Sequence, residues 1–260
     1  LGYGAAVDAI AADLKAKGLY EDTVIVVMGD NGPPLFRGKG FLYERGLLMP
    51  LIVRVPARFN PGFPPGMVSD ELVSALDIAP TFISLAGGTV PGYMEGRIFF
   101  GPNKQPEPQF LFGLRDRLDE NVDRVRSVCG KRYKYIRNFL PEKSCYDVGH
   151  KNVEAVSAGL ALYHEGKLPP VQAAYYQARA KEELYDLAND PNELTNLAGL
   201  SEHQATLRGL RAVLDNWITE KRDDGKFEDP AMLKEMDRRW EEFVKKRRER
   251  PQKSFKVPSP

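Results

Sequence analysis

The chain has 260 residues, 42% of them hydrophobic and 28% charged, which is enough to bury a core as one large domain or two small ones. Its 37 basic and 36 acidic residues give a formal charge of +1, and this balance argues against nucleic acid or an anionic membrane as a partner. No uninterrupted apolar segment approaches the roughly 20 residues that span a bilayer, so we expect no membrane span.

The first hundred residues begin with a helix pattern followed by strand patterns. Apolar residues recur at helical spacing before Gly18, which predicts a helix over residues 5–17. Residues 23–28, TVIVVM, are apolar on both faces, as is typical of a buried parallel strand with helices on each side. Residues 50–56, PLIVRVP, predict a second strand.

A second helix follows these strands. Asp77 stands near its expected N-cap, Pro80 falls in its first turn, and Gly87 ends it. Helix, strand, strand and helix in this order predict an α/β fold.

The pattern changes after about residue 101, where the segment GPNKQPEPQ predicts a connection between subdomains. Beyond it we expect a small antiparallel sheet plus a helix, and then a charged helix with a disordered tail. The short strands are predicted at QFLFGL, RVRSV, RYKYIR and EELYDL, and the predicted domains are 1–107, 108–221 and 222–260.

Two cysteines, Cys129 and Cys145, are too few for a disulfide framework and form no zinc-binding pattern. Two ordinary thiols are favoured over one disulfide, and the redox compartment stays open.

The segment GDNG directly follows the first predicted strand. Ligands of open α/β sheets lie beyond the carboxyl ends of the strands, so Asp30 and Asn31 are expected to face a site. A carboxylate beside an amide oxygen suits a hard cation such as Ca²⁺, with Mg²⁺ second, better than zinc. Asp-Asn-Gly is also a common turn sequence, which is the competing interpretation.

Lys39 follows eight positions later, between Gly38 and Gly40. The missing side chains of the two glycines would let an anion approach the ammonium and the backbone, so we expect a tetrahedral oxyanion there.

Other polar residues lie outside these two motifs. The charged segment around Arg115, Asp116 and Arg117 is either a solvated loop or, in the sharper hypothesis, a grip on a sulfated sugar through Arg115 and Arg117. We expect three histidines to lie on the surface, namely His150, His164 and His203. We expect Tyr175 and Tyr176 to pack against other side chains.

The stretch GDNGPPLFRGKGFLYERGLLMPLIVRVP resembles the C-terminal motif of the formylglycine-dependent sulfatases of the alkaline-phosphatase-like superfamily. The segments VSALDIAPTFISLAG, RVRSVCGKRYKYIRN and EELYDLANDPNELTNLAG are similar to later parts of that family, and the resemblance covers about residues 1–220. The short spacing from Asn31 to Lys39 is most similar to the heparan N-sulfatase (sulfamidase) branch.

This resemblance implies an α/β sulfatase fold and hydrolysis of sulfate esters or sulfamates, with a sulfated carbohydrate or other sulfate ester as substrate. It implies that Asp30 and Asn31 bind Ca²⁺ and that Lys39 binds a sulfate oxygen and stabilises the departing oxygen. It also implies a formylglycine nucleophile and a periplasmic or secreted location.

The sequence departs from the family at the nucleophile. No C-x-P-x-R or S-x-P-x-R motif occurs, and the acidic pair that would complete a calcium site is absent. The chain also starts with Leu1, so we expect the C-terminal half of a longer enzyme, inactive alone. A metal-dependent phosphodiesterase or phosphatase of the same superfamily, and a non-catalytic binding protein, remain alternatives.

Overall fold

We describe the protein from a computed structural model that covers residues 3–59, 64–118, 121–151 and 153–223, with residues 231, 234, 235, 238, 239 and 242. The chain forms two compact units, Leu1–Leu214 and Asp215–Pro260. The charged helix and tail expected from residue 222 onward lie largely outside the described residues. Among those that are described, no helix is long and apolar enough to cross a membrane.

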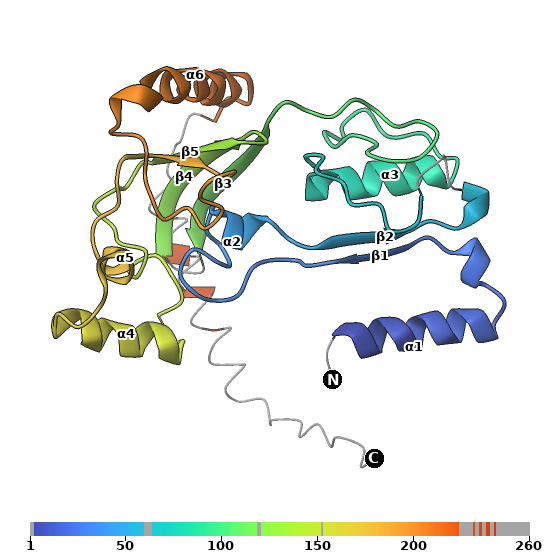
Figure 1. The fold of residues 1–260 in the computed structure, drawn as a ribbon, viewed down its shortest axis with the longest axis horizontal. Helices are drawn as coiled ribbons and strands as arrows, with labels where there is room; N and C mark the ends of the chain where they lie inside the picture. Colours follow the sequence, from blue (N-terminus) through green and yellow to red (C-terminus); the bar gives the residue numbers. More distant parts are fainter. Residues whose placement is uncertain are drawn as a thin grey trace, which may run out of the picture. The chain divides into compact units, whose positions relative to one another are not determined.

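The predicted α/β order is present in the first unit (Figure 1). Helix α1 ends close to the expected position because the left-handed Gly18, with φ of 67°, follows it. The short α2, which the sequence did not predict, lies between the two strands in chain order. These elements are α1 (Tyr3–Ala16), β1 (Ile25–Met28), α2 (Glu44–Leu47), β2 (Leu51–Arg54) and α3 (Ile78–Leu85).

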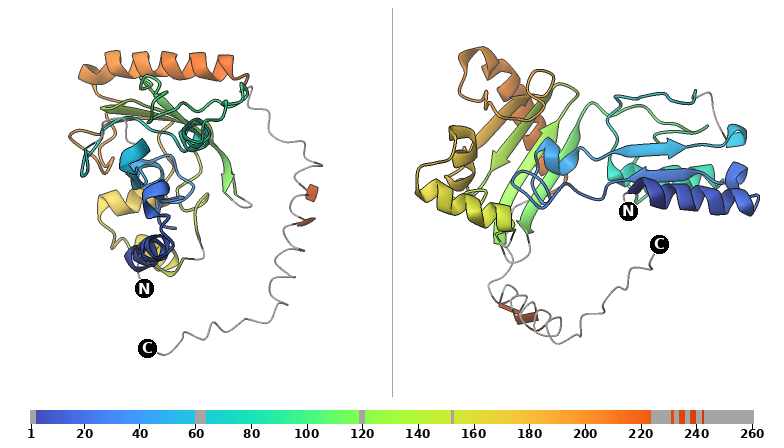
Figure 2. Two further views of the ribbon diagram at one scale, coloured as in Figure 1. Left: turned by 90° about the vertical axis from the view of Figure 1, so that its right-hand side faces the viewer. Right: turned by 60° about the horizontal axis from the view of Figure 1, so that its bottom comes forward.

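The first strand pairs differently from the prediction. Strands β1 and β2 form a two-stranded antiparallel ribbon in which Val26 lies opposite Val53, so the expected parallel pairing is wrong in this structure. The ribbon lies between α1 and α3 in Figures 1 and 2, which agrees with helices on each side. The local pattern predicted the strand, but strand direction depends on the partner, which no local pattern reports.

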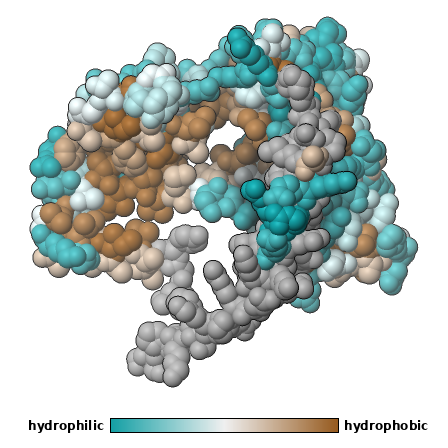
Figure 3. Space-filling view, turned by 180° about the vertical axis from the view of Figure 1, so that it is seen from behind, coloured by the Kyte–Doolittle hydropathy of each residue, from teal (hydrophilic) through white to brown (hydrophobic). Residues whose placement is uncertain are grey.

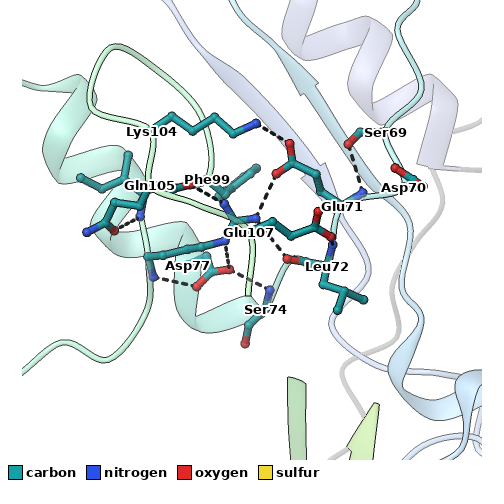
Figure 4. A network of polar contacts seen from close by, with 12 residues as sticks. Ser69, Asp70, Glu71, Leu72, Ser74, Asp77, Phe99, Lys104, Gln105 and Glu107 are labelled. Atoms are coloured by element: carbon teal, nitrogen blue, oxygen red, sulfur yellow. Dashed lines mark hydrogen bonds and ion pairs between the residues drawn. The ribbon is translucent and has the colours of Figure 1, made fainter. Parts of the chain in front are cut away.

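Asp77 is the N-cap residue of α3, as predicted, although its side chain makes no capping hydrogen bond to that helix. Its side chain accepts hydrogen bonds from Ser74 N at 2.9 Å and Arg97 N at 2.8 Å, so it joins the turn before α3 to the following loop (Figure 4). Arg97 continues the network to Glu71 at 3.1 Å, and Glu107 accepts from Leu72 N at 2.7 Å. The connection at residues 97–107 is therefore fastened to the start of α3.

The predicted antiparallel sheet follows, with strand order β3-β4-β5-β6 (Figure 2). The buried residues of α6 in this unit are Leu207, Leu210 and Leu214, whose spacing of three and four places them on one face of the helix. The elements are β3 (Leu111–Leu118), β4 (Asn121–Cys129), β5 (Tyr133–Asn138), α4 (Glu154–His164), α5 (Pro170–Ala173), β6 (Glu182–Asp186) and α6 (Gln204–Glu220). Single-turn 3₁₀ helices complete the order at Tyr20–Asp22, Ala57–Phe59, Ala75–Asp77, Ala174–Tyr176 and Ser201–His203.

One core joins the loop after β1 to the small sheet. Its loop members are Phe41, Leu42 and Tyr43, all consecutive and all buried. Their partners come from the sheet and the loop after it: Val125, Ile136, Cys145, Val148 and Tyr185. Tyr175 and Tyr176 pack on Phe36 with ring centroids 5.1 Å away, which confirms their predicted packing role.

Apolar side chains also gather on the surface of the α/β part, as Figure 3 shows from behind. Among the described residues of this part of the chain, Ile52 is 65% exposed and Val68 is 94% exposed. Isolated exposed apolar residues are common, but a contiguous area of them marks a surface suited to covering by other protein.

Candidate functional site

The loop between β1 and β2 carries three of the predicted site residues. Asp30 and Lys39 are exposed and Asn31 is half-buried. Within the described residues, none of the three side chains makes a hydrogen bond or an ion pair. One loop thus carries a carboxylate, an amide and an ammonium that have no hydrogen-bonding or ionic partner among the described residues.

The backbone of this loop closes on itself. Lys39 N donates to Pro33 O at 2.8 Å, and Gly38 N donates to Leu35 O at 3.0 Å. This closure brings Lys39 back to a point two residues after Asn31. Convergence of the three side chains on one ligand stays a prediction.

The glycines flanking Lys39 have a packing reason that the sequence did not reveal. A Cβ atom at Gly38 would lie 2.1 Å from Pro33 O, so any side chain would push the backbone at Pro33 away. Gly40 has φ of 81°, and a Cβ there would meet Leu118 Cδ1 at 2.8 Å. Both glycines therefore permit the tight closure itself, whether or not an anion approaches.

The residues after Lys39 fasten the loop to the small sheet. The Tyr43 hydroxyl donates to Glu183 at 2.9 Å, and the same carboxylate accepts from Tyr185 Oη and Asn138 Nδ2, each at 2.5 Å. Burial, and then the Glu183 charge, raise the pKa of Tyr43, so its hydroxyl keeps the proton that it donates. The tyrosine of the motif acts as an anchor.

Glu44, the residue after Tyr43, makes an ionic contact with a buried lysine. Lys134, fully buried in β5, lies 2.5 Å from Glu44 and 3.1 Å from Glu193. Glu193 also accepts from Glu44 N at 2.7 Å, and burial raises the pKa of Glu193 although Lys134 opposes the shift. A buried charge without such partners would cost several kcal/mol, by general estimates for ions removed from water, so the three groups depend on one another.

Arg37 fixes the part of the loop that precedes Lys39. Its φ of 59° is left-handed, and its guanidinium lies 4.2 Å from the ring centre of Tyr43. The same group donates to Tyr185 Oη at 3.2 Å and to the backbone oxygen of Glu193. Lys39 is therefore exposed between two fastened segments.

Arg115 has a supporting place that the sugar-binding hypothesis did not foresee. Its guanidinium is buried, donates to Gly40 O at 2.8 Å and to Val148 O, and lies 3.4 Å from Asp123. These contacts connect β3 to the Lys39 loop. In this structure its donors face protein groups, and contact with substrate stays a prediction.

Arg117 lies two residues further along β3, beyond an irregularity in the pairing with β4. It is half-buried and pairs across the sheet with Val122. Its predicted contact with a sulfated sugar also stays a prediction.

His150 departs from the expected solvent-facing position. It is half-buried, and its Nε2 lies 3.2 Å from Lys39 O, although 111 residues separate the two in sequence. No local pattern signals such a contact. The same is true of Lys134, Glu183 and Glu193, which the sequence analysis did not single out.

The described residues contain no group of three His, Cys, Asp or Glu side chains placed to hold a metal ion. Asp30 and Asn31 therefore fit part of a cation site only. Both described cysteines are free thiols, and burial raises the pKa of each to about 11. Protonated thiols are poor nucleophiles at neutral pH.

The geometry suits recognition of an oxyanion. An ammonium on a flexible four-carbon stem projects from a loop whose backbone is fixed on both sides. A carboxylate and an amide oxygen, the ligand types that hard cations prefer, precede it on the same loop. These are the group types that an anion and part of a cation shell require, and their binding roles stay predictions.

Comparison with known proteins gives a family for these features. Residues 4–88 match the sulfatase family model. An ulvan-active sulfatase of Formosa agariphila is 36% identical over 234 residues, covering 88% of this chain and 38% of that protein. Human N-sulphoglucosamine sulphohydrolase is 27% identical, covering 82% of this chain and 45% of that protein.

A solved structure agrees with the fold. The chain superposes on a 2-O GAG sulfatase with a TM-score of 0.61 and 23% identity, covering 87% of this chain and 43% of that one. The predicted α/β fold of alkaline-phosphatase-like type, with its small antiparallel sheet, is confirmed. The chain spans less than half the length of each of these proteins.

Proposed function

Since this chain belongs to the sulfatase family, we propose that it forms part of an enzyme that hydrolyses sulfate esters or sulfamates of a sulfated glycan. The observation that supports this most is the uncommitted ammonium of Lys39 on a fixed loop, next to Asp30 and Asn31. The proposal concerns the whole protein, because this chain spans only part of its relatives.

Lys39 is proposed to contact a sulfate oxygen. Its positive charge would interact more strongly as negative charge builds on the leaving oxygen, which lowers the barrier rather than only tightening binding. The fixed backbone on both sides of Lys39 supports this role, because the loop that carries the charge does not have to rearrange during the reaction.

Asp30 and Asn31 are proposed as two oxygen ligands of Ca²⁺, with Mg²⁺ as the second choice. The exposure of Asp30 and the lack of partners of both side chains support this, and the other ligands would come from outside the described residues. When bound, such an ion would draw charge from the sulfate oxygens. The family nucleophile, formylglycine, would lie in a part of the protein that this sequence does not contain, because no C/S-x-P-x-R motif occurs here.

The substrate is proposed to be a sulfated carbohydrate. The names of the relatives point to ulvan and to N-sulphoglucosamine, so O-sulfate and N-sulfate are both candidates. The loop spacing favours the sulfamidase branch, whereas sequence identity is higher to the ulvan-active relative. A direct comparison of the two linkages decides between them.

The test is sulfate release by the full-length protein from an aryl sulfate, a sulfated polysaccharide and an N-sulfated glucosamine. We expect release from at least one of them and little turnover of an aryl phosphate diester. Faster cleavage of the diester would favour the phosphodiesterase alternative. No turnover of any of the four would contradict the proposal.

A further inference from the structure

Three hydrogen bonds fix the backbone on either side of the Lys39 side chain. One is internal to the loop, from Lys39 N to Pro33 O at 2.8 Å. The other two come from the small-sheet region, where His150 Nε2 lies 3.2 Å from Lys39 O and Arg115 Nη1 donates to Gly40 O at 2.8 Å. Consecutive carbonyl groups of the loop are thus held from outside it.

The direction of the His150 contact follows from chemistry. A carbonyl oxygen can only accept, so His150 must carry a hydrogen on Nε2 whenever this bond is formed. The ring therefore acts as a donor toward the loop. Its other nitrogen, Nδ1, is not required for the contact.

The segment that carries His150 is itself well fixed. Arg115 donates to Val148 O, two residues before His150. Gly149 packs closely, since a Cβ there would lie 2.5 Å from Cys145 O and 3.3 Å from the ring of Phe41. Because Phe41 is two residues after Lys39, one packed unit joins both sides of the contact.

Holding the backbone matters for a lysine in particular. The Lys39 side chain is long and exposed, so the direction in which its ammonium reaches depends on the orientation of its peptide. Small errors in the placement of a group that meets the transition state reduce rate strongly. A donor on Lys39 O is well placed to prevent such errors.

We propose that His150 is a positioning residue for Lys39, acting through the hydrogen bond from its Nε2 to Lys39 O. This inference rests on the proposed function, in which Lys39 contacts the sulfate. His150 is not assigned a contact with substrate. Its effect is to keep the lysine pointed at the anion.

The test uses three variants of the full-length protein, His150→Gln, His150→Asn and His150→Ala. A glutamine amide nitrogen can reach about as far as the ring Nε2, whereas the asparagine amide is one carbon shorter. We expect Asn and Ala to lower kcat/KM for sulfate release by about 3- to 10-fold, the effect of one neutral hydrogen bond. Gln should rescue most of this loss, and the melting temperature should be unchanged in all three.

The background of Lys39→Ala separates positioning from substrate contact. There, His150→Asn should cause no further loss, because the residue through which it acts is gone. An equal loss in both backgrounds would overturn the proposal, as would equal effects of Gln and Asn. A melting temperature that falls in step with activity would show a purely structural role and overturn it as well.

Hydrogen exchange of the peptide that covers residues 36–42 gives a readout that needs no sulfatase activity. His150→Asn should speed this exchange about 3- to 10-fold, and His150→Gln should not. The exposed His164, changed to Asn, is the matched control and should alter neither readout. Unchanged exchange with intact sulfatase activity would sink the inference alone, whereas faster exchange in a protein without sulfatase activity would sink only the proposed function.

Discussion

Lys39 shows how one residue can be exposed and yet closely controlled. Its ammonium has no partner in the described structure, while its backbone is held by Pro33 and His150. A charged group in this state is available to a ligand, and its backbone needs no further ordering when the ligand binds. This combination distinguishes it from an ordinary surface lysine.

We expect Lys39→Ala in the full-length protein to lower kcat/KM for sulfate release by about 100-fold or more, or at least roughly 2.7 kcal/mol. The loss follows because the ammonium gains interaction as charge develops on the leaving oxygen. Lys39→Arg need not rescue activity, since a planar fork reaches differently from a point charge. Steady-state kinetics check this, and Lys17→Ala, which removes an exposed lysine paired with Asp13, is the control.

Asp30→Ala should also abolish activity, but through loss of a metal ligand rather than of a sulfate contact. Added Ca²⁺ should therefore restore part of the activity of Asp30→Ala and none of that of Lys39→Ala. Titration of both variants with Ca²⁺ during sulfate release provides the measurement. If both respond alike, the separate roles assigned to the two residues are wrong.

At the scale of elements, loops here are fixed by a few buried polar side chains rather than by regular structure. Asp77 joins the turn before α3 to the connection at residue 97, and Glu183 joins the Tyr43 segment to β6. Each carboxylate accepts from donors far apart in sequence. Loss of one such group should therefore loosen more than one segment.

Asp77→Ala should lower the free energy of unfolding by about 2–4 kcal/mol, because it leaves Ser74 N, Arg97 N and the nearby Arg97 guanidinium without their acceptor. Asp13→Ala is the matched control, since it removes an exposed carboxylate from an i,i+4 pair worth about 0.3–0.5 kcal/mol. Urea unfolding of both variants measures the difference. Equal losses would mean that the Asp77 network contributes little.

The pKa of Asp186, at the end of β6, predicts the direction in which stability changes at acid pH. The hydrogen bond from Arg132 lowers the pKa of Asp186 to about 2. A folded-state pKa below the unfolded value of about 3.9 stabilises the protein above that value, and this contribution is lost as the pH falls from about 4 to about 2. Asp186→Asn should flatten that part of the curve of urea midpoint against pH, and an unchanged slope would count against the Arg132 contact.

At the scale of the whole molecule, the 260-residue chain should show no sulfatase turnover by itself and should bind Ca²⁺ weakly. Asp30 and Asn31 supply two oxygen ligands of the roughly 6 to 8 that Ca²⁺ takes, and the sequence holds no formylglycine motif. Calorimetric titration with Ca²⁺ and an aryl sulfate assay measure both properties. Turnover above background would show that the chemistry has been misplaced.

The sequence by itself determined the features that depend on local pattern. The helix before Gly18, the strand before Gly29 and the four short strands of the small sheet were all predicted, because periodicity and turn residues report local structure. The motif around Lys39 also predicted the family. The roles of Asp30, Asn31 and Lys39 in catalysis stay predictions.

Only the tertiary structure decided what touches what. It made β1 and β2 antiparallel, placed His150 against Lys39, and turned the donors of Arg115 toward the loop backbone. Partners separated by tens of residues leave no periodic signal, because their contact depends on how whole elements pack. Tyr43 and Glu44 could be read from the sequence as part of a motif, but their anchoring on Glu183 and Lys134 required the folded sheet.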